Sequence, residues 1–143
     1  MFGFIMANIL ILGAGGIGLP IASALKHEEY NLVLSDYSEE AIGKAKEYFF
    51  NRKFDSECSL DFHVGDAKDY LDKNKLDFDI VVSALPYYMN KEIAFACVGA
   101  GVAYVDLGGH VDTTNYIRNI TDEIGCAPVA SDQGLAPGLV NIC

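Results

Sequence analysis

Short apolar runs recur along the whole chain, and a helix-like segment follows almost every one of them. Several of these runs are apolar throughout instead of alternating with polar residues, which is typical of strands covered on both faces. We predict strands over residues 8–13, 31–36, 60–64, 79–84, 103–107 and 127–131. Strands that alternate with helices indicate parallel β–α–β units rather than an antiparallel meander.

The segments between the strands contain signals for the start and the end of helices. A first helix is expected over residues 17–26, and Ser38 can cap a second helix that runs to about Phe50. Asp66 lies three residues before Asp69, a pairing that resembles a capping box. These signals predict three helices in the first half of the chain.

Two more helices are expected in the second half. Asn90 can cap a helix that ends near Gly99 or Gly101, and Asp112 can cap one that ends at Gly125. Six strands joined by five crossovers match an α/β, doubly wound Rossmann domain: a six-stranded parallel sheet of order 3-2-1-4-5-6 with helices on both faces. We therefore expect the 143 residues to form one domain.

Charge and cysteine spacing narrow the function. The formal net charge is −10, with 20 acidic residues against 10 lysines and arginines, and such a surface repels nucleic acid and anionic membranes. No apolar run reaches the roughly 18 residues of a membrane helix. The four cysteines form no CxxC pair, so neither a disulfide framework nor a metal site is expected. We interpret them as buried, reduced thiols of a cytoplasmic protein.

A glycine-rich turn follows the first strand directly. Gly13, Gly15 and Gly18 fit the spacing G-x-G-x-x-G at the point where a strand ends and a helix opens. Gly13 allows the tight exit from the strand, Gly15 lets the backbone approach a pyrophosphate, and Gly18 lets the helix pack close to the sheet. With Gly16 and Ile17 they form the predicted phosphate-binding turn at a helix N-terminus. The alternative is a purely structural glycine turn.

An acidic residue lies at the position where the ribose of a dinucleotide is expected to bind. Asp36 ends the second strand, 23 residues after Gly13, and a carboxylate there can accept hydrogen bonds from ribose hydroxyls. The alternative role of Asp36 is to cap the next helix. A 2′-phosphate would meet a like charge, and the segment that begins at Tyr37 adds two acids and no arginine. We therefore predict NAD rather than NADP as the cofactor, with Tyr37 among the contacts.

Two further segments are expected to contact the nucleotide. Asp66, followed by Ala67, can bind the adenine amino group or can simply cap the next helix. The other segment leaves the carboxyl end of the fourth strand, where ligands bind in open α/β sheets. It consists of Ser83, Ala84, Leu85 and Pro86. Its small residues would let the backbone lie against ribose and nicotinamide.

Four segments together resemble the N-terminal cofactor domain of the saccharopine dehydrogenase-like oxidoreductases. They read ILGAGGIG, SALPYY, AYVDLGGH and SDQGLAPGLVN, and the resemblance covers about residues 7–142. Its most specific part is Asp-x-Gly-x-x-Pro-Gly, at Asp132, Gly134, Pro137 and Gly138. The group includes saccharopine reductase, lysine 6-dehydrogenase and carboxynorspermidine synthase, and SALP with Asp36 looks closest to the NAD-linked lysine dehydrogenase-like members.

This resemblance implies hydride transfer between nicotinamide and the nitrogen-bearing carbon of an amino acid, with Asp132 near the nicotinamide. It also implies that a second domain follows residue 143, binds the amino-acid substrate and supplies most catalytic residues. The chain is then a fragment that binds cofactor but catalyses nothing alone, and it can belong to a homo-oligomer. His110 is the local candidate for proton transfer, with an ordinary loop histidine as the alternative. Tyr87 and Tyr88 either line the pocket or cover the sheet edge.

Two other classes of protein use similar signals. A nucleotide-sensing regulatory domain of potassium transport also has a glycine turn, an acid after its second strand and a Gly-Asp after its third, and it needs no substrate domain. A methyltransferase also places an acid on the ribose of S-adenosylmethionine. The SALPYY segment and the motif at Asp132 count against the regulator, and the glycine spacing counts against the methyltransferase.

Overall fold

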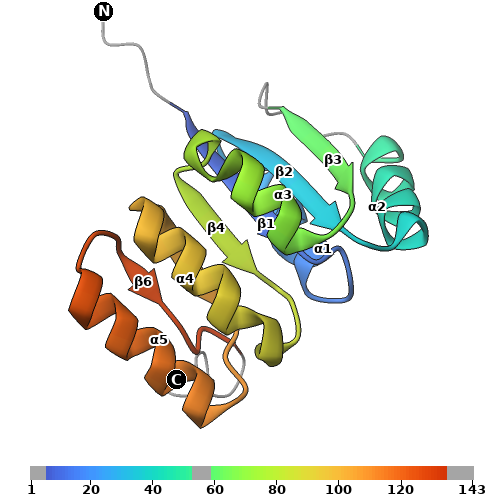
Figure 1. Ribbon diagram of the computed structural model, residues 1–143. Coiled ribbons are helices and arrows are strands. Elements are labelled where there is room, and N and C mark those ends of the chain that lie inside the picture. Colours follow the sequence, from blue (N-terminus) through green and yellow to red (C-terminus); the bar gives the residue numbers. More distant parts are fainter. Residues whose placement is uncertain (1–5, 53–58, 135–143) are drawn as a thin grey trace, which may run out of the picture.

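The computed structural model describes residues 6–52 and 59–134 (Figure 1). Six strands, all paired in parallel, form one sheet in the order β3-β2-β1-β4-β5-β6, which confirms the predicted doubly wound topology. The strands are β1 (Ala7–Leu12), β2 (Tyr30–Asp36), β3 (Leu60–Val64), β4 (Ile80–Ser83), β5 (Ala103–Asp106) and β6 (Val129–Ala130). The α-helices are α1 (Gly18–Leu25), α2 (Glu39–Phe50), α3 (Ala67–Asn74), α4 (Asn90–Ala100) and α5 (Val111–Ile124).

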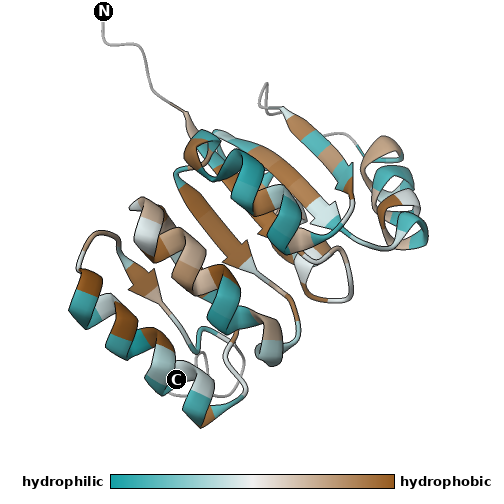
Figure 2. Ribbon diagram, in the orientation of Figure 1, coloured by the Kyte–Doolittle hydropathy of each residue, from teal (hydrophilic) through white to brown (hydrophobic). Residues whose placement is uncertain are grey.

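The central strand β1 is apolar on both faces because helices cover both. Ile9 and Ile11 belong to a core with α1 and α2, whereas Leu10 and Leu12 belong to a core with α3, α4 and α5. Figure 1 shows the second group of helices in front of the sheet and the first group behind it. Alternate side chains of a strand point to opposite faces, so one apolar run supplies both cores. In Figure 2, β4 is brown along most of its length, whereas the edge strand β3 also carries teal positions.

Two of the predicted N-caps are confirmed. The hydroxyl of Ser38 accepts a hydrogen bond of 3.2 Å from the N–H of Ala41 at the start of α2. The carboxylate of Asp66 accepts one of 2.9 Å from the N–H of Asp69 at the start of α3. Each bond satisfies a backbone donor that the first helical turn leaves unpaired.

The other two N-cap predictions are wrong. Asn90 is the first residue of α4, after Met89, and its buried side chain accepts a 2.7 Å hydrogen bond from the hydroxyl of Ser83 instead of capping the helix. Asp112 lies inside the first turn of α5, whose N-cap is His110. Asn90 does not cap α4 because its side-chain amide is bonded to the buried Ser83 of β4. Asp112 does not cap α5 because the helix begins one residue before it.

The predicted glycines at the C-terminal ends of two helices are confirmed. Gly101 is the C-cap of α4 and Gly125 that of α5, and both glycines have left-handed backbones, with φ of 73° and 64°. A residue without a Cβ adopts this conformation at no steric cost, which is why glycine ends so many helices.

The cysteines differ from the prediction at one position. Cys97 is buried, and burial raises the pKa of its thiol to about 12, whereas Cys126 is exposed and free. Cys58 and Cys143 lie outside the described residues. Within residues 6–52 and 59–134, no helix is long and apolar enough to cross a membrane, and no three His, Cys, Asp or Glu side chains are grouped to hold a metal ion.

Candidate functional site

The turn after β1 is wedged between the backbones of two neighbouring strands. Gly13 has a φ of 98°, and its N–H donates a 2.7 Å hydrogen bond to the carbonyl of Ser35 on β2. On the other side, a Cβ at Gly13 would lie 2.9 Å from the carbonyl oxygen of Ala84, just after β4. Both the backbone conformation and this close approach therefore require glycine.

The helix that follows is packed directly onto the turn. A Cβ at Gly18, the first residue of α1, would lie 1.7 Å from the carbonyl oxygen of Gly13. Gly15 and Gly16 face the other way, since a Cβ on either would meet nothing within 4 Å. The start of α1 has no side-chain cap and no acid in its first turn, and Ile17 beside it is 56% exposed. An anion at this helix start would therefore meet the positive end of the helix dipole and no acidic side chain of the first turn.

The Asp36 carboxylate is held against this turn. One of its oxygens accepts a 2.7 Å hydrogen bond from the N–H of Ala14, and the other accepts one of 2.8 Å from the N–H of Ser38. Ser38, not Asp36, is the N-cap of α2, so the alternative role of Asp36 as a helix cap is excluded. Each carboxylate oxygen keeps capacity for a further hydrogen bond, as from a ribose hydroxyl.

A cavity of about 510 Å³ lies beside the turn. It is lined on one side by Ala14, Gly15, Gly16, Leu19 and Pro20, and on the other by Ser38, Glu40, Ala41 and Lys44. Its volume is in the usual range of small-molecule sites, and it lies at the carboxyl ends of β1 and β2, the edge where doubly wound sheets bind nucleotides.

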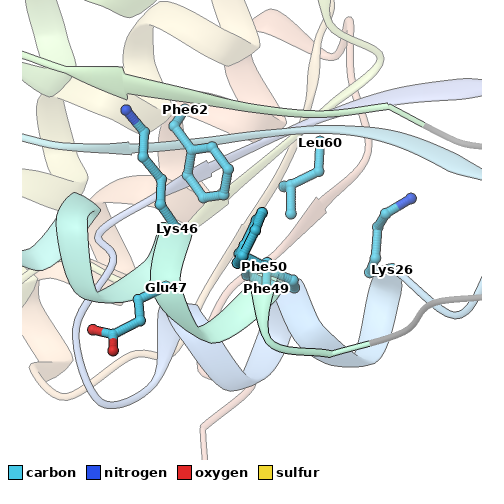
Figure 3. A pocket seen from close by; sticks show the side chains of 7 residues that line it. All are labelled: Lys26, Lys46, Glu47, Phe49, Phe50, Leu60 and Phe62. Carbon is cyan, nitrogen blue, oxygen red and sulfur yellow. The ribbon is translucent and has the colours of Figure 1, made fainter.

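A second cavity, of about 750 Å³, lies at the opposite end of the strands. Figure 3 shows the rings of Phe49, Phe50 and Phe62 gathered around it with Leu60. Leu60 opens β3 and Phe50 ends α2, so this apolar cavity is at the amino edge of the sheet and belongs to no part of the predicted site.

Of the predicted contacts after β4, Ala84 lies closest to the turn. Its N–H donates a 2.8 Å hydrogen bond to the carbonyl of Leu12, and its carbonyl borders Gly13. Ser83 is buried and its hydroxyl points into the core, so its backbone is what it can offer a cofactor. Leu85 is partly buried, and Pro86 is exposed at the start of a short 3₁₀ turn.

The predicted adenine contacts lie along the same edge. The N–H of Gly65 donates a 2.9 Å hydrogen bond to the carbonyl of Asp36, which keeps the ends of β2 and β3 together. Asp66 is exposed while it caps α3, and Ala67 is buried beneath it. Tyr37 is 82% exposed. The capping role of Asp66 is confirmed, and adenine binding by Asp66, Ala67 and Tyr37 stays a prediction.

Asp132 is held by a different set of groups. Its φ is 61°, its N–H donates a 3.2 Å hydrogen bond to the Asp106 carboxylate, and its own carboxylate accepts one of 2.8 Å from the hydroxyl of Thr114. The buried Asp106 also accepts a 2.7 Å bond from the N–H of Gly108, and burial raises its pKa. These contacts place Asp132 among β5, α5 and the chain after β6. Residues 137–138 of its motif lie outside the described residues.

Two aromatic rings meet at this end of the sheet. His110 stacks on Tyr87 with ring centroids 4.8 Å apart and planes 10° from parallel, and both side chains are exposed. Tyr88 lies edge-on to Tyr87 at 5.9 Å. The loop after β4 and the start of α5 are therefore neighbours at the carboxyl edge.

Three residues of this edge, Glu40, Lys44 and Asp106, were given no individual role from the sequence. The ammonium of Lys44 donates a 2.6 Å hydrogen bond to the carboxylate of Glu40, and both residues line the cavity beside the turn. Their spacing of four residues predicts an ion pair on the surface of a helix, but it does not predict that this surface faces the glycine turn. Asp106 was not singled out, because its hydrogen bond with Asp132 joins residues 26 apart in the sequence.

A doubly wound sheet, a turn that admits no Cβ at Gly13 or Gly18, and a carboxylate held against that turn define a dinucleotide-binding domain. The chain belongs to the family described as the saccharopine dehydrogenase NADP binding domain, whose family model matches residues 9–128. This is a family of oxidoreductases, as the resemblance of the sequence implied. Membership counts against the potassium-transport regulator and the methyltransferase.

The chain also resembles individual proteins of known name. It is 24% identical over 134 residues to mitochondrial alpha-aminoadipic semialdehyde synthase of Bos taurus, and 26% identical to that of Rattus norvegicus. These matches cover 92% of this chain but 14% of each relative, so the chain spans a small part of their length.

Solved structures show the same fold. Apo saccharopine dehydrogenase (L-Glu forming) from Saccharomyces cerevisiae has a TM-score of 0.73 at 18% identity, over 94% of this chain and 28% of that one. WlbA dehydrogenase from Chromobacterium violaceum, in complex with NADH and UDP-GlcNAcA, has a TM-score of 0.65 at 17% identity, over 87% of this chain and 35% of that one.

Proposed function

We propose that this chain is the coenzyme-binding part of an oxidoreductase that acts on the CH–NH group of an amino acid. The observation that carries the proposal is the Asp36 carboxylate held against the turn at Ala14, beside open space at Gly15 and Gly16. A dinucleotide fits this arrangement with its diphosphate at the start of α1 and its adenosine ribose at Asp36. Family membership supports the choice of a saccharopine- or lysine-like substrate.

A bound nicotinamide coenzyme would supply or accept the hydride. The part of this chain is to orient the coenzyme along the carboxyl edge, where Ala84 borders the turn and Tyr87 and His110 form an exposed wall. We propose that a further domain binds the amino-acid substrate and supplies the proton-transfer groups, with assembly into a homo-oligomer. Localisation in the cytoplasm stays a prediction, and the two curated relatives are named as mitochondrial proteins.

We propose NAD as the preferred coenzyme. Asp36 places a negative charge where a 2′-phosphate would lie, and Lys44, the cation that lines the adjacent cavity, is already paired with Glu40. The description of the family names NADP and favours the opposite preference. The two possibilities differ in which coenzyme the chain binds more tightly.

Titration of the chain with NADH and NADPH, followed by nicotinamide fluorescence, tests this proposal. We expect tighter binding of NADH, and a preference at least tenfold smaller in Asp36→Ala, because a hydrogen bond to a charged group contributes about 1.5–3 kcal/mol. Asp61→Ala, which removes an exposed acid from β3, is the matched control and should change neither affinity. Equal affinities for the two coenzymes would refute the NAD preference, and binding of neither would refute the proposed function.

A further inference from the structure

The cavity beside the glycine turn contains an ion pair that the binding of NAD leaves unexplained. Glu40 and Lys44 both line the cavity, opposite Gly15 and Gly16. Their side chains lie one turn apart on α2, joined at 2.6 Å, and are 78% and 71% exposed. An exposed pair of this kind stabilises a helix only slightly, so its contribution to the fold is small.

With a ribose bound at Asp36, a 2′-phosphate would be directed toward this cavity. Asp36 is bonded to Ala14 on one wall and to Ser38 on the other, so a ribose at Asp36 stands at the mouth of this space. Groups attached to the 2′ carbon would extend toward Ser38 and Lys44. Of these, Lys44 has the charge and the reach to bind a phosphate.

Glu40 forms an ion pair with that lysine. The carboxylate holds the ammonium by a charged hydrogen bond, which lowers the pKa of Glu40 and raises that of Lys44. A phosphate in the cavity would have to compete with Glu40 for the same cation and would also be repelled by it. The net charge of Glu40 and Lys44 on the cavity wall is therefore zero as long as the two are paired.

We infer that Glu40 is a specificity-determining residue of the coenzyme site, which keeps Lys44 from a 2′-phosphate and so favours NAD over NADP. The inference rests on the proposed function, since it presupposes that a dinucleotide binds at the turn. It adds a second discriminating group to Asp36, on another element and by another mechanism. Asp36 repels the phosphate directly, whereas Glu40 keeps Lys44 in an ion pair so that this lysine does not bind the phosphate.

The test is the ratio of the dissociation constants for NADPH and NADH, measured by fluorescence titration of the chain. Glu40→Gln frees Lys44 and is expected to lower this ratio about two- to fivefold, the size of one exposed ion pair. The gain should shrink between 50 mM and 500 mM NaCl, because salt screens exposed charges. The double variant Glu40→Gln, Lys44→Gln should return the ratio to the wild-type value.

The matched control is the equivalent pair on α3, in which the ammonium of Lys68 donates to the carboxylate of Asp72. Asp72→Asn also removes one negative charge, together with the ion pairs of Asp72 to Lys68 and Lys75, but away from the cavity, and should leave the ratio unchanged. The inference is overturned if Glu40→Gln binds NADH with an unchanged ratio, or if Asp72→Asn or the double variant shows the same fall. Failure of the wild-type chain to bind either coenzyme would overturn the proposed function together with this inference.

Discussion

At the scale of single residues, the site depends on two glycines that are required for different reasons. Gly13 is required by its own backbone, which is left-handed and lies against the carbonyl of Ala84. Gly18 has ordinary helical geometry and is required by its neighbour, since the carbonyl of Gly13 occupies the place of its Cβ. The second requirement links the fold to binding, because the same contact fixes where the N–H groups of α1 point.

We expect Gly18→Ala to weaken NADH binding at least tenfold and to destabilise the fold by about 1–3 kcal/mol, because the added methyl group must displace the turn. Thermal unfolding and fluorescence titration measure the two effects. Gly16→Ala is the control for stability, since its Cβ meets nothing within 4 Å, and its melting temperature should match that of the wild type. A Gly18→Ala variant with unchanged stability would show that the contact is not as close as described.

Residue roles that depend on near neighbours in sequence could be predicted. Ser38 and Asp66 each accept a hydrogen bond from the backbone N–H three residues ahead, and so short a spacing can be recognised in the sequence. Asn90 and Asp112 have the same chemistry before a helical segment, and both predictions failed. The side chain of Asn90 finds Ser83 in the folded core, a partner on another element that outcompetes the local backbone.

At the scale of elements, pairing and packing determine where each one ends. We predicted the last strand over residues 127–131, but β6 is only Val129–Ala130, the two residues that pair with Tyr104 and Val105 of β5. Strand β3, at the other edge, has the predicted bounds of Leu60–Val64. The apolar helix α4 lies between α3 and α5 (Figure 1), which explains why it lacks a strongly polar face.

The helix α2 supplies a prediction with an internal control. Ser38→Ala should lower the free energy of unfolding by about 1 kcal/mol, because the N–H of Ala41 loses its partner. Gly43→Ala, in the middle of the same helix with nothing within 4 Å of its Cβ, should raise it by about 0.5–1 kcal/mol. Urea unfolding followed by circular dichroism measures both. A Ser38→Ala variant as stable as the wild type, with Ser38→Asn no different, would contradict the capping role.

At the scale of the whole molecule, parallel pairing gathers the site at one edge. The glycine turn, Asp36, Asp66, Ala84 and His110 come from five separate stretches of sequence, and each lies at or just after the carboxyl end of a strand. The described residues form the coenzyme side of this edge. Under the proposed function, the groups that bind an amino acid and move its proton come from a further domain, and the chain itself spans 14% of the length of its curated relatives.

The separation between coenzyme and substrate sides predicts a division of activity. The chain of 143 residues should bind NADH but reduce no NAD in the presence of saccharopine or lysine. A longer protein that contains it should reduce NAD with such an amine, measured as absorbance at 340 nm, and Asp36→Ala in that protein should lower kcat/KM. An active longer protein whose rate is indifferent to Asp36→Ala would contradict the role of Asp36, and inactivity with every amino acid would contradict the proposed substrate class.

The sequence by itself determined the order of strands and helices and the glycine spacing of the turn. These features depend on periodicity and on backbone freedom, which act over a few neighbouring residues. Only the tertiary structure decided that Asp36 bonds Ala14, 22 residues away, that Asp106 bonds Asp132, 26 residues away, and that Lys44 turns toward the glycine loop. Such partners meet because of strand order and helix rotation, which are set by the packing of both cores at once.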